Sequence, residues 1–192
     1  FSYKGEEFAI SLAGVYQKEN AVLALNALEE LDRLGWTTTM EQRKDGLLHT
    51  SWKGRFTVIN KKPLFIVDGA HNAGAADKMA ESVRHYFNGK KLIYIMGVFA
   101  DKEYKIVLEK TAHFAEKIYT IETPDNPRAL PAEELAKAAR VYNSSAESTK
   151  SIKDAVEKAF SCAGDDENSV ILAFGSLSFI GALTNAVEEY VG

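Results

Sequence analysis

The sequence has 192 residues, of which 46% are hydrophobic and 26% charged, and its formal net charge is -4 at pH 7. This length is slightly more than one average domain of roughly 150 residues, and the composition is typical of a folded globular protein rather than a disordered one. No Lys/Arg-rich stretch with interleaved aromatic residues is present, so we expect no nucleic-acid partner.

The single cysteine, Cys162, excludes an internal disulfide and a metal site built from several cysteines. No apolar run approaches the roughly 20 residues needed to cross a bilayer, and the N-terminus does not have the pattern of a signal peptide. We therefore expect a cytoplasmic protein, monomeric and without a membrane partner. The chain begins with Phe1 rather than methionine, which suggests part of a longer protein.

The first part of the chain predicts a strand followed by a helix. The strand is expected at residues 8–12, and apolar residues three or four positions apart then predict an amphipathic helix that Gly35 ends. The polar stretch 37–46 is expected to be a linker, so a second domain would begin near residue 47.

The remainder of the chain alternates between strands and helices. Strands are expected at residues 56–60, 64–67, 92–96, 118–121 and 170–174. Apolar stripes that predict helices with a buried face lie within residues 76–87, 104–115, 135–139, 152–159 and 180–187. This alternation predicts an α/β fold over residues 47–192, a Rossmann-like, mainly parallel sheet flanked by helices.

The most informative segment is Leu64-Phe65-Ile66-Val67-Asp68-Gly69-Ala70-His71-Asn72-Ala73-Gly74, where a buried strand runs into three polar residues and two glycines. Polar groups at the carboxyl end of a strand usually face a ligand, and Gly69 is expected to let the backbone turn sharply. The free N–H groups of the helix that follows favour phosphate or carboxylate. The segment is nevertheless not a P-loop, because Ala75 and Ala76 stand where that loop needs lysine and serine or threonine.

Several motifs together resemble a known family. Asp-Gly-Ala-His-Asn at 68–72 resembles the Asp-Gly-Ala-His-Asn-Pro loop of folylpolyglutamate and dihydrofolate synthases, members of the Mur ligase superfamily, with Ala73 in place of proline. Residues 14–24 resemble the family's Gly-x-His-Gln-x-x-Asn-Ala-x-x-Ala stretch, with Tyr16 in place of histidine. Trp52-Lys53-Gly54-Arg55-Phe56 is similar to its Trp-Pro-Gly-Arg-Phe. Further matches in family order are Gly97 with Asp101-Lys102-Glu103, residues 124–130 and residues 175–177.

The resemblance implies an enzyme that uses ATP and Mg²⁺ to phosphorylate a substrate carboxylate. The amine of L-glutamate then displaces phosphate from the acyl phosphate. The implied substrates are folate and, if dihydrofolate synthase activity is also present, dihydropteroate. Residues 1–36 would be the tail of the central ATP-binding domain, whose phosphate loop and Mg²⁺ ligands lie outside this sequence. We therefore expect no metal ligands in this chain and no ligase activity from it alone.

The resemblance also assigns roles to five residues. Asn20 would contact the nucleotide, Arg55 its phosphates and Asp68 the nucleoside. A guanidinium makes paired bonds to phosphate oxygens, and a carboxylate at a strand end accepts from ribose hydroxyls. His71 would lie beside the reacting centre as a catalytic residue that also orients glutamate, and Ser176 would bind the glutamate carboxylate.

Each of these residues also has a structural interpretation. Asn20, Asp68 and Ser176 can cap helices, Arg55 can be a solvated strand residue, and His71 can be a structural hydrogen-bonding group. Asp101-Lys102 has the pattern of a capping and surface charge pair.

Two other functions remain open from the sequence. One is a cell-wall Mur ligase, which shares the chemistry but acts on a UDP-linked precursor. The other is a Rossmann-like binding module without catalysis, which the missing P-loop keeps possible. The four histidines lack zinc-ligand spacing.

Overall fold

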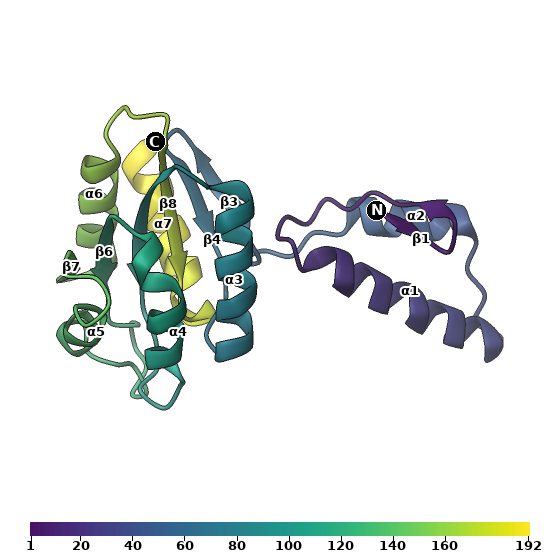
Figure 1. Cartoon of the computed structure of the whole chain (residues 1–192), viewed down its shortest axis with the longest axis horizontal. Coiled ribbons are helices and arrows are strands. Elements are labelled where there is room, and N and C mark those ends of the chain that lie inside the picture. The colour runs from purple at the N-terminus through teal and green to yellow at the C-terminus, as the bar shows by residue number, and fades with distance from the viewer.

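The computed structural model describes residues 1–192 and divides them into two lobes (Figure 1). The larger lobe is built on a six-stranded sheet with the order β3-β4-β8-β5-β6-β7. The strands are β3 (Thr57–Lys61), β4 (Leu64–Val67), β5 (Lys91–Met96), β6 (Lys117–Thr120), β7 (Ala146–Ser148) and β8 (Ser169–Phe174). Every neighbouring pair is parallel except β3 and β4, so the prediction of a mainly parallel sheet is confirmed.

Helices cover both faces of this sheet. They are α3 (Ala73–Tyr86), α4 (Tyr104–Thr111), α5 (Ala132–Ala139), α6 (Ile152–Ala163) and α7 (Ile180–Val191). Alternate strand residues face opposite sides, so Tyr94 packs in the core cluster formed with α3, α4 and α5, while Ile93 and Ile95 pack in the cluster formed with α6 and α7. Both faces of the central strands are buried, which is why these strands are continuous apolar runs.

The smaller lobe differs from two sequence-based expectations. It contains a short hairpin of β1 (Ser2–Tyr3) and β2 (Glu6–Glu7), then α1 (Gln17–Arg33) and α2 (Met40–His49). Residues 8–12 are not a strand, because no neighbouring strand is there to accept their hydrogen bonds.

The stretch 37–46, predicted as a linker, is mostly helical. Thr39 starts α2 with a capping box, in which its Oγ1 accepts from Gln42 N at 3.2 Å and its own N–H donates to Gln42 Oε1 at 2.9 Å. Because α2 has no buried residue, it carries none of the apolar periodicity by which helices are recognised.

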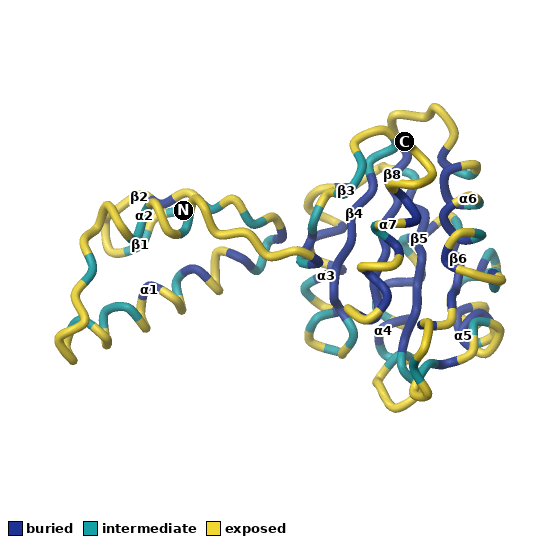
Figure 2. The backbone as a smooth tube through the Cα atoms, turned by 180° about the vertical axis from the view of Figure 1, so that it is seen from behind, coloured by how far each residue is buried: buried dark blue, intermediate teal, exposed yellow.

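Few residues of the smaller lobe are buried, and Figure 2 accordingly colours most of its tube as exposed or intermediate. Ala21 and Leu25 are the buried apolar residues of α1, whereas Leu23 and Trp36 are 70% and 74% exposed. The assignment of residues 1–36 to a separate ATP-binding domain stays a prediction. No helix of either lobe has the length and apolar character that crossing a membrane requires.

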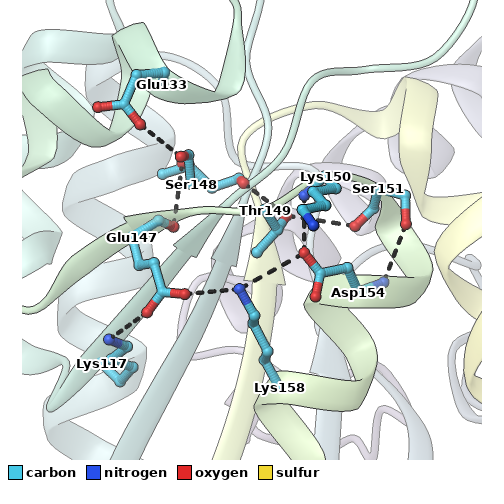
Figure 3. A network of polar contacts seen from close by, with 10 residues as sticks. Lys117, Glu133, Glu147, Ser148, Thr149, Lys150, Ser151, Asp154 and Lys158 are labelled. Atoms are coloured by element: carbon cyan, nitrogen blue, oxygen red, sulfur yellow. Dashed lines mark hydrogen bonds and ion pairs between the residues drawn. The ribbon is translucent and has the colours of Figure 1, made fainter.

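The edge strand β7 was not predicted, and polar contacts hold it in place (Figure 3). The carboxylate of Glu147 accepts from Lys117 Nζ on β6 at 2.9 Å and from Lys158 Nζ on α6 at 2.7 Å. The next residue, Ser148, donates to Glu133 of α5 at 2.5 Å. Three polar or small residues give no strand signal in a sequence, because their pairing depends on neighbours that only the fold supplies.

This ion network predicts a pH effect on stability. The hydrogen bonds from Lys158 and Lys117 lower the pKa of Glu147 from 4.5 to about 2. Because the depressed pKa favours the ionised form in the folded state, this stabilisation is complete above about pH 4.5 and is lost as the pH falls towards 2. We expect the free energy of unfolding, measured in urea between pH 6 and pH 3, to fall less steeply for Glu147→Gln than for the unchanged protein. Glu167→Gln is the control, because its partner Lys62 and Glu167 itself are both 86% exposed. Equal slopes for all three proteins would contradict the prediction.

Candidate active site

The loop between β4 and α3 lies at the carboxyl edge of the sheet, where β4 ends at Val67 and α3 begins at Ala73. Asn72 caps the helix, its Oδ1 accepting from Ala75 N at 2.9 Å. Gly69 does not have a positive φ, so its backbone conformation does not require glycine. A Cβ at this position would lie 2.5 Å from Cδ2 of Leu177, a 45% exposed side chain that would have to shift.

Ala73, which replaces the proline of the resembling motif, occupies the first helical position of α3. Proline is favoured there, and the extended conformation of Asn72 (φ -138°, ψ 172°) is compatible with a following proline. The Ala73 N–H makes only a long, exposed hydrogen bond, to Glu103 Oε2 at 3.4 Å, so we expect Ala73→Pro to raise the free energy of unfolding by up to about 1 kcal/mol, measured by urea denaturation. Ala75→Pro is the control, since it removes the capped N–H and should destabilise by about 1 kcal/mol or more. Destabilisation by both substitutions would refute this account of position 73.

A cavity of about 430 Å³ lies between the start of α1 and the sheet lobe. It brings together Asn20, Arg55 and Asp68, the three residues predicted to contact a nucleotide, and adds Tyr16 and Lys78. These residues come from α1, the turn before β3, the end of β4 and α3. The cavity thus combines cationic side chains with a single carboxylate on its sheet side.

Asp68 is the most buried polar group of this cavity, at 3% exposed. Its Oδ2 accepts from Phe56 N at 2.8 Å and from the Tyr16 hydroxyl at 3.1 Å, and its Oδ1 accepts from Ala70 N at 2.8 Å. Burial raises the pKa of Asp68 above its usual value, against the opposing effect of these hydrogen bonds. The alternative role as the cap of α3 is excluded, because Asn72 fills it.

Arg55 and Asn20 also differ from their structural interpretations. Arg55 precedes β3, between Gly54 (φ +82°) and Phe56 (φ +46°), and is half-buried at the cavity rather than solvated on a strand. Its carbonyl accepts from Thr57, while its guanidinium has no ion pair. Asn20 does not cap α1, because Tyr16 is the N-cap of that helix. The Nδ2 of Asn20 instead donates to Gln17 Oε1 at 2.9 Å.

A second cavity, of about 220 Å³, contains His71 and Ser176, the two residues predicted to act on glutamate. Nδ1 of His71 lies 2.8 Å from the Gly69 carbonyl oxygen. Because that oxygen can only accept, Nδ1 carries a hydrogen, and in the neutral form of the ring Nε2 is then the free acceptor. Ser176 Oγ accepts from Ser178 N at 3.2 Å and caps the 3₁₀ turn Leu177–Phe179, as its structural interpretation predicts. Its hydroxyl hydrogen remains available.

Two cations of this second cavity have no role in the sequence-based assignment. Lys102 and Arg128 both contact it. Asp101 pairs with Arg128 (Oδ2 to Nη2, 2.6 Å) rather than with its neighbour Lys102, which corrects the expected surface pair. Arg128 also lies over the Phe99 ring at 4.8 Å. Residues 101–103 and 124–130 had been recognised as motifs, but nothing in a linear sequence indicates that they meet.

His71 and Asp68 therefore lie in different cavities, which flank the same loop. The chain has no group of three or more His, Cys, Asp or Glu side chains that could hold a metal ion. The arrangement has room for an anionic ligand on one side of the loop and for a small carboxylate, beside the His71 imidazole, on the other.

The structure is thus an α/β domain with a mainly parallel sheet and two cavities, each lined in part by cationic side chains, at the carboxyl edge of that sheet. Residues 54–177 match the family model described as the Mur ligase, glutamate ligase domain, and the chain belongs to this family.

Relatives agree with this assignment. The chain is 29% identical over 194 residues to the dihydrofolate synthase/folylpolyglutamate synthase of Bacillus subtilis, with 98% of this chain and 44% of the relative covered. The crystal structure of folylpolyglutamate synthase from Thermotoga maritima is 26% identical with a TM-score of 0.74, covering 95% of this chain and 41% of that one. The Mycobacterium tuberculosis folylpolyglutamate synthase complexed with ADP has the same fold, at 24% identity and a TM-score of 0.82 over 95% of this chain and 42% of that one. The chain thus spans less than half the length of each of these relatives.

Proposed function

We propose that this chain is the C-terminal part of an ATP-dependent ligase that adds L-glutamate to a folate through an acyl-phosphate intermediate. Membership of the glutamate ligase family and the names of the relatives support the substrate class. The observation that carries the proposal is the pair of cavities on either side of the β4–α3 loop, one containing Arg55 and Asp68, the other His71 and Ser176.

The chemistry explains why two cavities are needed. A carboxylate is a poor electrophile, because its charge repels a nucleophile and oxide is a poor leaving group; converting it to an acyl phosphate removes both obstacles. Arg55 would hold phosphate oxygens by paired hydrogen bonds, and Asp68 would accept from the nucleoside. Mg²⁺, bound by residues outside this chain, would offset phosphate charge.

The second cavity would hold the incoming amino acid. Ser176 donates to a carboxylate of glutamate, and Lys102 and Arg128 supply positive charge beside it. In the neutral form of His71, Nε2 would accept a hydrogen bond from the amine. This bond would orient the amine for attack, and Nε2 could then take its proton.

The test is amino-acid-dependent ADP release by the protein expressed from the complete open reading frame that contains this sequence. L-Glutamate is offered with a reduced folate, with dihydropteroate or with a UDP-muramoyl peptide precursor. We expect release with the reduced folate; release with dihydropteroate as well would add dihydrofolate synthase activity. Release with the muramoyl precursor alone would establish a cell-wall ligase instead, and no release with any of the three would favour a binding module.

The 192-residue chain itself provides a second measurement. We expect it to release no ADP with any acceptor, because Ala75 and Ala76 leave its only glycine-spaced loop without the lysine and hydroxyl of a P-loop. Appreciable turnover by the purified chain would show that its own residues suffice for phosphoryl transfer.

A further inference from the structure

Tyr16 reaches from the smaller lobe to the carboxylate at the end of β4. Its hydroxyl donates to Asp68 Oδ2 at 3.1 Å. Gly14 makes room for the ring: it has a φ of +108°, and a Cβ at this position would lie 2.9 Å from Cε1 of Tyr16. The backbone before α1 is therefore shaped to hold the phenol against the sheet lobe.

Asp68 has little acceptor capacity left. An ionised carboxylate offers about four lone-pair positions, and the N–H groups of Phe56 and Ala70, each at 2.8 Å, take two of them. The Tyr16 hydroxyl takes a third. A ligand that presents two adjacent hydroxyl groups needs two acceptor positions, so it cannot bind Asp68 fully while Tyr16 stays in place. The two backbone N–H groups are fixed by the fold, whereas the phenol is carried by the other lobe.

We propose that Tyr16 is a latch that competes with the vicinal hydroxyls of a nucleoside for Asp68. In this structure the phenol occupies the acceptor position, and a nucleoside diol that binds Asp68 displaces it. This inference rests on the proposed function, because it takes Asp68 as a nucleoside-binding residue.

The latch couples occupancy of the cavity to the junction between the lobes. Figure 1 shows the lobes adjoining where the start of α1 lies beside α3. Two other polar contacts lie there: Lys78 Nζ donates to Glu19 at 3.1 Å, and Val15 N donates to Ser82 Oγ at 3.3 Å. The contact made by Tyr16 is the one that a ligand of Asp68 replaces directly. Binding of a nucleoside diol therefore removes one of these three polar contacts at the junction.

The test uses Tyr16→Phe, which removes the hydroxyl and keeps the ring. The dissociation constants of ADP and of 2′,3′-dideoxy-ADP are measured by isothermal titration calorimetry on the protein from the complete open reading frame. Because binding to the variant no longer breaks a hydrogen bond, we expect ADP to bind about two- to tenfold more tightly to it than to the unchanged protein. Dideoxy-ADP, which has no hydroxyls to offer Asp68, should bind both proteins equally. Tyr142→Phe, at an exposed tyrosine following α5, is the control and should leave both constants unchanged.

Other outcomes overturn the latch. Weaker or unchanged ADP binding by Tyr16→Phe would show that the phenol contacts the nucleotide or has no effect on it. An equal gain for both nucleotides would show that the competition does not involve the ribose hydroxyls. If the unchanged protein does not bind ADP, the proposed nucleotide site is wrong and the latch with it. This result comes from the unchanged protein alone, so it is distinct from any result that compares the variant with it. Thermal unfolding of each variant verifies that it is folded.

Discussion

Replacing Arg55 by alanine is expected to lower kcat/KM for ATP roughly 100- to 1000-fold in the protein from the complete open reading frame, the range found when one preorganised charge-stabilising donor is removed. The guanidinium is half-buried beside Asp68, in a cavity that offers it no ion pair, so it is available to an anionic ligand. The measurement is steady-state ADP release at varied ATP concentration. A fall in kcat indicates contact with the transferring phosphoryl group, and a rise in KM alone indicates contact with bound ATP only.

Two variants sharpen this prediction. Arg55→Lys keeps the charge but loses the planar, paired geometry, so it should recover only part of the activity. Arg33→Ala removes an arginine that is 70% exposed at the end of α1 and should change kcat/KM less than twofold. Activity of Arg55→Ala within threefold of the unchanged protein would contradict the proposed role of Arg55.

Gly175→Ala is expected to lower the free energy of unfolding by roughly 2–5 kcal/mol, the combined cost of backbone strain and overpacking. Gly175 follows β8 with a φ of +117°, and a Cβ there would lie 2.5 Å from the carbonyl oxygen of Gly97, which follows β5. Neither backbone can move away, because β5 and β8 are hydrogen-bonded neighbours in the centre of the sheet. Urea denaturation at constant pH measures the change.

The matched control is Gly181→Ala, in the first turn of α7. Its Cβ would meet no atom within 4 Å, and alanine is the better helix former, so the free energy of unfolding should rise by up to about 1 kcal/mol. Equal effects of the two substitutions would contradict the close-packing account of Gly175. Since Ser176 follows directly, we also expect Gly175→Ala to distort the second cavity.

The elements that the sequence predicts correctly are those with strong periodic or continuous apolar patterns. The apolar run at residues 64–67 matches β4 residue for residue, and the stripes of α3 and α6 are buried as predicted. The elements that it misses have no apolar signal: α2 buries no residue, and β7 is held by pairing with β6 and by ion pairs. Residues 8–12 show the reverse case, in which a strand-like pattern has no strand to pair with.

The sequence by itself determined the α/β class, the family and which loop follows the buried strand, because all three depend on local patterns and short motifs. Only the tertiary structure decided how the motif residues are grouped, with Asp68 in one cavity and His71 in the other. It also placed Tyr16 on Asp68 across 52 positions of the chain, and Arg128 on Asp101 across 27. The physical reason is that such contacts depend on crossover connections and close backbone approaches at the sheet edge, which join residues that no local pattern relates.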